Sequence, residues 1–210
     1  MKPIMLAAAV MATLAAMLGS ASAEPVELQW WHAMTAINAE RVNKIATDFN
    51  ALQTGYKIVP VLGVLHRIRR ESDPAAPPVA IVDGEIRVRG EPAHLARRVR
   101  DHLISLARQE LGRRARLHAA RIGKPVARVS VRDTKSRWGS CSAKGSLSFS
   151  WRLVLAPDNV VDYVVAHEVA HLAEMNHGPR FWRLLRSLTP DCAAPRAWLT
   201  RHRARLLSYG

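Results

Sequence analysis

Residues 157–177 read PDNVVDYVVAHEVAHLAEMNH, and this stretch decides what kind of domain the chain contains. Residues i and i+4 of a helix lie on one face, so His167 and His171 can direct imidazole nitrogens at a single metal ion. Glu168 lies beside them, where a carboxylate can act on water without being a ligand. His177 follows closely in the sequence and is a candidate third ligand.

The residues around the motif favour a helix. Pro157-Asp158 is a typical helix start, and we expect the Asp158 carboxylate to cap free N–H groups of the first turn. We expect Gly178-Pro179 to stop the helix and to let the chain bend, so that His177 returns toward the metal. Apolar residues recur at helical spacing at Val161, Val164, Val165 and Leu172.

Three histidine ligands leave the fourth position of a tetrahedral zinc ion open, which is the catalytic pattern. We therefore predict one Zn²⁺ per chain and metal-assisted hydrolysis. In this reaction Glu168 would be the general base, taking a proton from water and returning it to the leaving group.

Two further charged residues lie close to the motif in the sequence. Glu174 shares a helix face with His167 and His171, so it could orient a liganding histidine, replace His177 as the third ligand, or remain a solvated carboxylate. Arg180 is either a partner for an oxyanion or phosphate, or a surface charge.

A second block precedes the motif. Residues 133–142 read DTKSRWGSCS, and an alternating stretch follows. It predicts a half-buried strand whose inward residues are Leu147, Phe149, Trp151 and Leu153. Such a strand beside the metal helix could hold an extended substrate through its backbone groups, or could serve only sheet packing.

Together, DTKSRWGSCS, SFSWRLVLAP, DYVVAHEVAHLAEMNH and RFW resemble the YgjP-like or SprT-like zinc metallopeptidases over residues 62–210. The resemblance implies an α+β fold with a zincin-like core, in which a small antiparallel sheet packs on the active-site helix. It also implies His167, His171 and His177 as zinc ligands and Glu168 as the catalytic residue.

The resemblance implies a zinc-dependent hydrolase, a metallopeptidase in the usual description, with peptides or proteins as substrates. Nucleotide pyrophosphohydrolysis at the same metal site is a second candidate activity. The sequence is also compatible with a basic nucleic-acid-binding module whose zinc is purely structural, and with an inactive fusion protein.

The beginning of the chain differs in character. Residues 1–23 have the basic start, apolar run and small-residue exit of a cleaved signal peptide, which is too short to be a stable membrane anchor. Residues 24–61 predict a short βαβ fragment and resemble the start of a periplasmic glycerol-phosphate or sugar solute-binding protein of the transporter type. A stretch this short cannot supply one lobe of such a receptor, so no binding function is carried over.

Charge changes at the same place. Residues 1–61 carry four basic and four acidic side chains, whereas residues 62–210 carry 27 and 13, which gives the chain its net charge of +14. We predict that two unrelated sequences join near residue 61 and that the metallopeptidase part is truncated at its N-terminus. The excess of arginine is typical of a solvated basic surface, with nucleic-acid binding as the less favoured interpretation.

The remaining elements complete one domain. Residues 79–88 predict a hairpin with an Asp83-Gly84 turn, and residues 93–121 a long scaffold helix with Leu95, Val99, Leu103 and Leu106 on one face. Helices are expected near residues 181–188 and 193–208.

The sequence contains two cysteines, Cys141 and Cys192, which we expect to be reduced thiols. The signal peptide predicts periplasmic export, whereas the family resemblance implies a cytoplasmic protein. The sequence leaves the compartment, like the oligomeric state, open.

Overall fold

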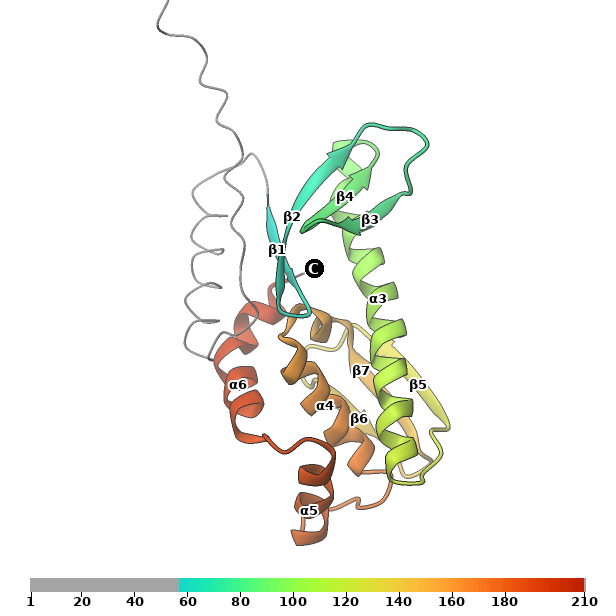
Figure 1. Cartoon of the computed structure of the whole chain (residues 1–210), viewed down its shortest axis with the longest axis vertical. Coiled ribbons are helices and arrows are strands. Elements are labelled where there is room, and N and C mark those ends of the chain that lie inside the picture. Colours follow the sequence, from blue (N-terminus) through green and yellow to red (C-terminus); the bar gives the residue numbers. More distant parts are fainter. Residues whose placement is uncertain (1–56, 210) are drawn as a thin grey trace, which may run out of the picture. The chain divides into compact units, whose positions relative to one another are not determined.

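The computed structural model describes residues 57–209, which form a mixed α+β unit with two small sheets (Figure 1). The predicted signal peptide and most of the predicted βαβ fragment lie outside the described residues. No helix in the described range is long and apolar enough to cross a membrane. The elements in chain order are β1 (Ile58–Val61), β2 (Val64–Glu71), β3 (Val79–Val82), β4 (Glu85–Arg89), α3 (Pro92–Arg121), β5 (Arg128–Arg132), β6 (Gly139–Cys141), β7 (Ser146–Ser150), the 3₁₀ helix η1 (Trp151–Leu155), α4 (Asp158–Ala170), α5 (Pro179–Leu188) and α6 (Ala193–Leu207).

The first sheet has the strand order β1-β2-β4-β3. Strands β3 and β4 form the predicted hairpin, in which Asp83 and Gly84 have φ angles of 51° and 72°. Two consecutive positive φ angles give a turn whose twist matches that of the strands, which explains the Asp-Gly sequence. Strands β2 and β4 are parallel, so the sheet is mixed and the prediction of an antiparallel sheet is wrong.

The hairpin of β1 and β2 spans the position where two sequences were predicted to join. Val61 pairs with Val64, and the backbone N–H of Leu62 donates to the carbonyl of Val154, 2.7 Å away, in the C-terminal part of the domain. Val59 and Val61 belong to the hydrophobic core. The sequence boundary at residue 61 therefore lies inside a turn, and the domain bounds themselves stay predictions.

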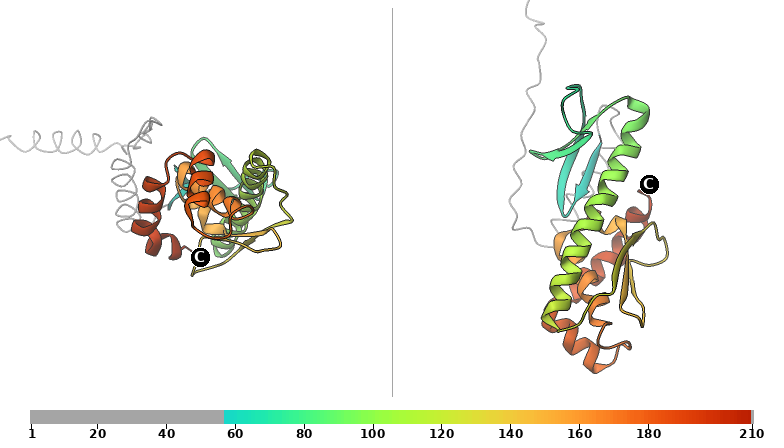
Figure 2. Two further views of the ribbon diagram at one scale, coloured as in Figure 1. Left: turned by 90° about the horizontal axis from the view of Figure 1, so that it is seen from below. Right: turned by 90° about the vertical axis from the view of Figure 1, so that its right-hand side faces the viewer.

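Helix α3 is a packed scaffold element, as predicted. Its buried apolar residues recur every four positions, which places them on one stripe that faces α4, η1 and β5. Figure 2 shows α3 running past both sheets, and it contacts β3, β4 and β5. The stripe consists of Val99, Leu103, Ala107, Leu111, Ala115 and Ala119.

The second sheet has the order β5-β7-β6, with β5 parallel and β6 antiparallel to β7. The predicted strand 147–153 is wrong beyond Ser150, because Trp151–Leu155 forms a 3₁₀ helix that is buried on all sides. The alternating pattern misled because Arg152, read as solvent-facing, has no exposed surface. Its guanidinium pairs with Asp133 and donates to the carbonyl of Tyr209 at 2.9 Å, so the buried charge has a counter-ion, although Nη2 has no hydrogen-bond partner among the described residues.

Helix α4 carries the histidine motif and contacts α3, α5, α6 and β6. The N-cap is Pro157, and Asp158 makes no capping hydrogen bond, so the predicted cap is wrong. Asp158 lies in the first turn and pairs with the buried Arg114 of α3, whose charge competes successfully for the carboxylate. Cys141 and Cys192 are free, as expected.

Candidate metal centre

The three histidines come from the end of α4 and the loop that follows it. His167 lies in the last turn, and His171 is the C-cap with φ −66° and ψ −15°, so it is still one helical turn from His167. Gly178 is the N-cap of α5. Gly178-Pro179 therefore begins the next helix, and the prediction that it ends α4 is wrong, because α4 has already ended at Ala170.

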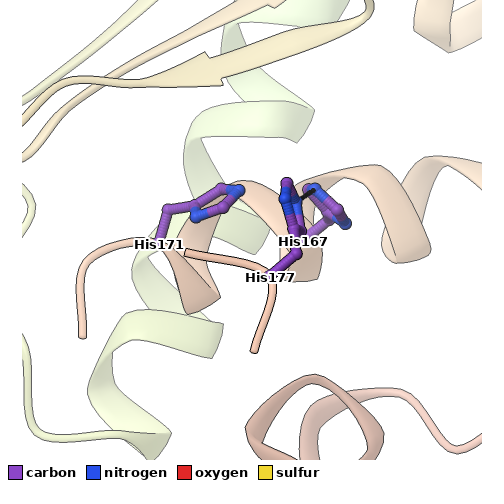
Figure 3. Close-up of side chains that lie close together, drawn as sticks. All are labelled: His167, His171 and His177. Carbon is purple, nitrogen blue, oxygen red and sulfur yellow. Dashed lines mark hydrogen bonds between the residues drawn. The ribbon is translucent and has the colours of Figure 1, made fainter. Parts of the chain in front are cut away.

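The structure brings the side chains of all three histidines together (Figure 3). One ring nitrogen from each lies within 4.8 Å of the other two. Nε2 of His177 lies 3.0 Å from Nε2 of His167. Ligands of a tetrahedral zinc ion lie about 3.3 Å apart when each bond is about 2.0–2.1 Å long, so the cluster is already close to ligand spacing.

The hydrogen bonding of His171 leaves its metal-facing nitrogen available. Nδ1 of His171 lies 3.0 Å from the main-chain carbonyl of Glu174. A carbonyl can only accept, so Nδ1 carries the proton and Nε2 keeps its lone pair. Glu174 thus orients a histidine through its backbone, whereas its carboxylate is not part of the cluster.

The half-buried rings of His167 and His171 are neutral at pH 7, the form that binds metal. Burial lowers the pKa of His167 to about 4, and the neighbouring rings of His171 and His177 act in the same direction. Burial also lowers the pKa of His171, against the opposing effect of the Glu174 carbonyl. His167 and His171 can therefore offer lone pairs without first losing protons.

An aromatic frame holds His167. Its Nδ1 is buried and has no hydrogen-bond partner among the described residues, although a liganding histidine usually donates from this atom. Packing replaces that bond, since the ring centroid of Phe181 lies 5.0 Å from that of His167 and 4.6 Å from those of His171 and His177. Phe181 of α5 has no exposed surface. The sequence indicated only a core role for this residue.

Glu168 points toward the second sheet and is 8% exposed. Burial raises the pKa of Glu168 to about 7, and the nearby Arg137 opposes this shift. Strand β6 lies directly against the carboxylate, because a β-carbon placed on Gly139 would come within 2.5 Å of Cγ of Glu168. Nothing in the sequence singles out Gly139, which contacts Glu168 only through the fold.

A cavity of about 420 Å³ adjoins His167 and Glu168. Three arginines from distant parts of the sequence line it: Arg137 from the segment before β6, and Arg196 and Arg203 from α6. Arg180 is exposed and is not among the lining residues, so the anion partner suggested by the sequence lies elsewhere than this cavity.

Residues 37–202 match the family described as YgjP-like, metallopeptidase domain. The chain belongs to this family. The match begins upstream of residue 62, where the resemblance was expected to start. No solved structure matches the YgjP-like chain.

Short N-terminal stretches are similar to the sn-glycerol-3-phosphate-binding periplasmic protein UgpB, as the sequence predicted. Identity is 50% over 44 residues with the protein of Brucella abortus (strain 2308), covering 21% of this chain and 10% of that protein. It is 57% over 35 residues with that of Agrobacterium fabrum, covering 17% and 8%. The chain thus spans about a tenth or less of these relatives.

Proposed function

We propose that this YgjP-like protein is a zinc-dependent hydrolase that cleaves peptide bonds. The observation that carries the proposal is the convergence of three imidazole nitrogens within 4.8 Å, next to the buried carboxylate of Glu168. Three histidines with a neighbouring glutamate are a catalytic zinc pattern, because they leave one coordination position for a reactant. A zincin-like core, in which the motif helix lies under a sheet, belongs to the same proposal.

His167, His171 and His177 would hold the ion. Neutral imidazoles suit zinc, and the spacing of the nitrogens fits its tetrahedral ligand shell. When bound, zinc supplies Lewis acidity, which polarises the substrate carbonyl and lowers the pKa of water. The Glu174 carbonyl fixes the orientation of His171, and Phe181 packs against all three rings.

Glu168 would act as the general base. Its carboxylate takes a proton from the attacking water and then donates it to the nitrogen of the leaving amine. A pKa of about 7 suits both halves of this transfer, because the group can be ionised before the attack and protonated after it. Gly139 limits where the carboxylate can lie, because the backbone of β6 passes directly against the Glu168 side chain.

Strand β6 would bind the peptide. The sequence pointed to the stretch around Phe149, but β7 is the central strand and both of its edges are paired. Strand β6 pairs only with β7 within the described sheet, so its other edge is unpaired there, and the strand contacts the helix that carries the motif. An extended peptide can add to such an edge through main-chain hydrogen bonds.

The test uses the full chain and its Glu168→Gln variant. We expect about one zinc ion per chain in both proteins, measured by plasma mass spectrometry. Peptide hydrolysis should fall at least 100-fold in Glu168→Gln, since general-base catalysis contributes roughly 10²–10⁴-fold. Equal turnover by the two proteins would remove Glu168 from the mechanism. A folded chain that holds no zinc would point to a non-enzymatic or inactive protein, and turnover of nucleotides but not peptides would favour pyrophosphohydrolysis.

A further inference from the structure

The cavity beside the metal centre is lined mainly by positively charged side chains. Within the described part of the chain, Arg137, Arg196 and Arg203 line it, whereas Glu168 is its single carboxylate. Arg196 and Arg203 lie seven residues apart on α6, which places both on the face that also presents Leu199 to the cavity. Trp138 and Tyr163 supply aromatic walls.

These arginines differ from the interior ones because they form no salt bridge among the described residues, although Arg137 is near enough to Glu168 to lower the pKa of that carboxyl. Arg114 is paired with Glu110 and Arg152 with Asp133, so the buried cations of the fold are neutralised internally. Among residues 57–209, the salt bridges include none made by the three cavity arginines. Three arginines and one carboxylate line the cavity, so an excess of positive charge remains beside the candidate metal site.

All three arginines are exposed, and the guanidinium of Arg203 is held in place by its contacts. Nη2 of Arg203 donates to the carbonyls of Lys135 and Ser136, at 3.2 and 3.1 Å, and its guanidinium carbon lies 6.0 Å from the centroid of the Trp138 ring. Thr134 donates to the carbonyl of Arg137 at 3.0 Å, which closes the loop that carries Arg137. A site fixed before binding loses less conformational entropy when a ligand enters.

We infer that this cavity is a specificity subsite that binds a carboxylate of the peptide substrate beside the cleaved bond. The inference rests on the proposed peptidase function and adds the substrate class. Planar guanidinium groups match the geometry of a carboxylate and can bind it through two parallel hydrogen bonds. Two peptide groups have this chemistry: an acidic side chain next to the cleaved bond, and the free C-terminus.

A cationic or neutral group would fit the cavity less well. A lysine or arginine side chain would meet three like charges and the single carboxylate of Glu168, so repulsion would outweigh attraction. The apolar surfaces of Trp138 and Tyr163 screen this repulsion less than water does. A glutamine has the shape of glutamate but leaves the positive charge unneutralised. Comparing peptides that differ only by Glu or Gln therefore measures the effect of the charge at nearly constant side-chain size.

The first experiment measures cleavage by the full zinc-loaded chain. The cleaved bond is located by mass spectrometry in an unbiased peptide mixture. Matched quenched peptides then carry Glu or Gln on either side of that bond, or end in a free acid or an amide. We expect kcat/KM to be about 10-fold higher for the acidic member of one pair, and which pair responds identifies the source of the carboxylate.

Arg196→Gln is the test variant, and Arg116→Gln on the exposed side of α3 is the matched control. The acidic preference should fall from about 10-fold to below 3-fold in Arg196→Gln and remain in Arg116→Gln. It should also shrink as salt is raised, since partly exposed charges are screened. Equal cleavage of both members of every pair by the parent protein would overturn the inference and leave the peptidase function standing.

A binding measurement tests the carboxylate subsite independently of the proposed peptidase function. Fluorescently labelled Glu and Gln peptides are titrated with zinc-loaded Glu168→Gln protein, and anisotropy gives Kd. We expect the Glu peptide to bind about 10-fold more tightly than the Gln peptide. This difference should be lost in the double variant that carries Arg196→Gln together with Glu168→Gln. This result without any hydrolysis in the parent would keep the subsite and reject the peptidase function. Equal affinities for the two peptides would reject the carboxylate subsite, as would binding of a nucleoside triphosphate by a protein that binds neither peptide.

Discussion

A β-carbon at Gly139 would lie 2.5 Å from Cγ and 2.7 Å from Oε1 of Glu168, so glycine is required where β6 passes the candidate base. The contact links a strand edge to a carboxylate 29 positions later in the sequence. It means that the position of the carboxylate is set by backbone, which moves less than a side chain would.

Gly139→Ala should displace the Glu168 side chain while leaving the histidines in place. Misplacing a catalytic group by about 1 Å can cost on the order of 100-fold in rate, so we expect kcat to fall by about that factor with zinc content unchanged. Overpacking should also cost about 1–3 kcal/mol in the free energy of unfolding. Gly112→Ala in α3, where the new methyl meets only a flexible arginine end, is the control. Unchanged kcat in Gly139→Ala would show that Glu168 tolerates a different position.

His177→Ala should weaken zinc binding without unfolding the protein, because His177 is exposed on the loop between α4 and α5. A ligand that binds only the folded state stabilises it by about 2.7 kcal/mol at 100 times its Kd. We expect added zinc to raise the Tm of the parent chain and to leave that of His177→Ala nearly unchanged. The exposed His94→Ala variant should respond like the parent. A full zinc response in His177→Ala would exclude this residue as a ligand.

Phe181→Leu should weaken zinc binding by removing the ring that packs against the three histidines. Phe181 is fully buried and packs against the three imidazole rings, so a smaller side chain leaves space beneath them. We expect a loss of about 1–2 kcal/mol in unfolding free energy and a weaker zinc affinity, measured by competition with a chromogenic chelator. Leu188→Ala, in the same helix and also buried, serves as the comparison. If both variants lower stability but keep the parent's zinc affinity, the aromatic frame has no role in holding the ligands.

Acid should destabilise the fold through Glu110. The hydrogen bond from Arg113 lowers the pKa of Glu110 to about 2, Arg114 acts in the same direction, and burial opposes them. A carboxylate whose folded pKa lies below its ordinary value of 4.5 stabilises the fold above that value. The stabilisation is lost as pH falls toward 2.

The measurement is urea unfolding of the parent and Glu110→Gln across this pH range. The difference in unfolding free energy should be on the order of 1–2 kcal/mol near pH 6, allowing for solvent screening, and close to zero near pH 2. A difference that stays constant with pH would mean that the ionised form of Glu110 contributes nothing.

Local signals in the sequence predicted the helix of the motif, the hairpin around Asp83-Gly84 and the scaffold helix α3. The proximity of His167 and His171 follows from helical spacing alone. Other features depend on contacts between distant segments. The sequence pattern placed Arg152 on the solvent side, because its ion pair with Asp133 depends on the tertiary fold. Asp158 does not cap the helix, because its carboxylate pairs with Arg114 of α3.

The residues of the candidate site likewise include some that local sequence predicted and some that only the fold brings together. His177 was suggested by its closeness to the motif, and the loop before α5 indeed carries it to His167. Gly139 and the cavity arginines lie on β6, its preceding loop and α6, and nothing in their local patterns marks them. The spacing of Glu174 suggested a role for its carboxylate, whereas its main-chain carbonyl makes the contact, and a main-chain role leaves no trace in residue type.

The hairpin of β1 and β2 makes the dissection of this protein hazardous. Cutting the chain at the compositional change near residue 61 would remove β1 and strip β2 of its antiparallel neighbour. The four residues of β2 that pair with β1, Val64 to Arg67, would then present unsatisfied backbone groups to other molecules, a known template for aggregation. Strand β1 also lies within residues 37–202, which match the YgjP-like family, so a cut near residue 61 would divide the matched region itself.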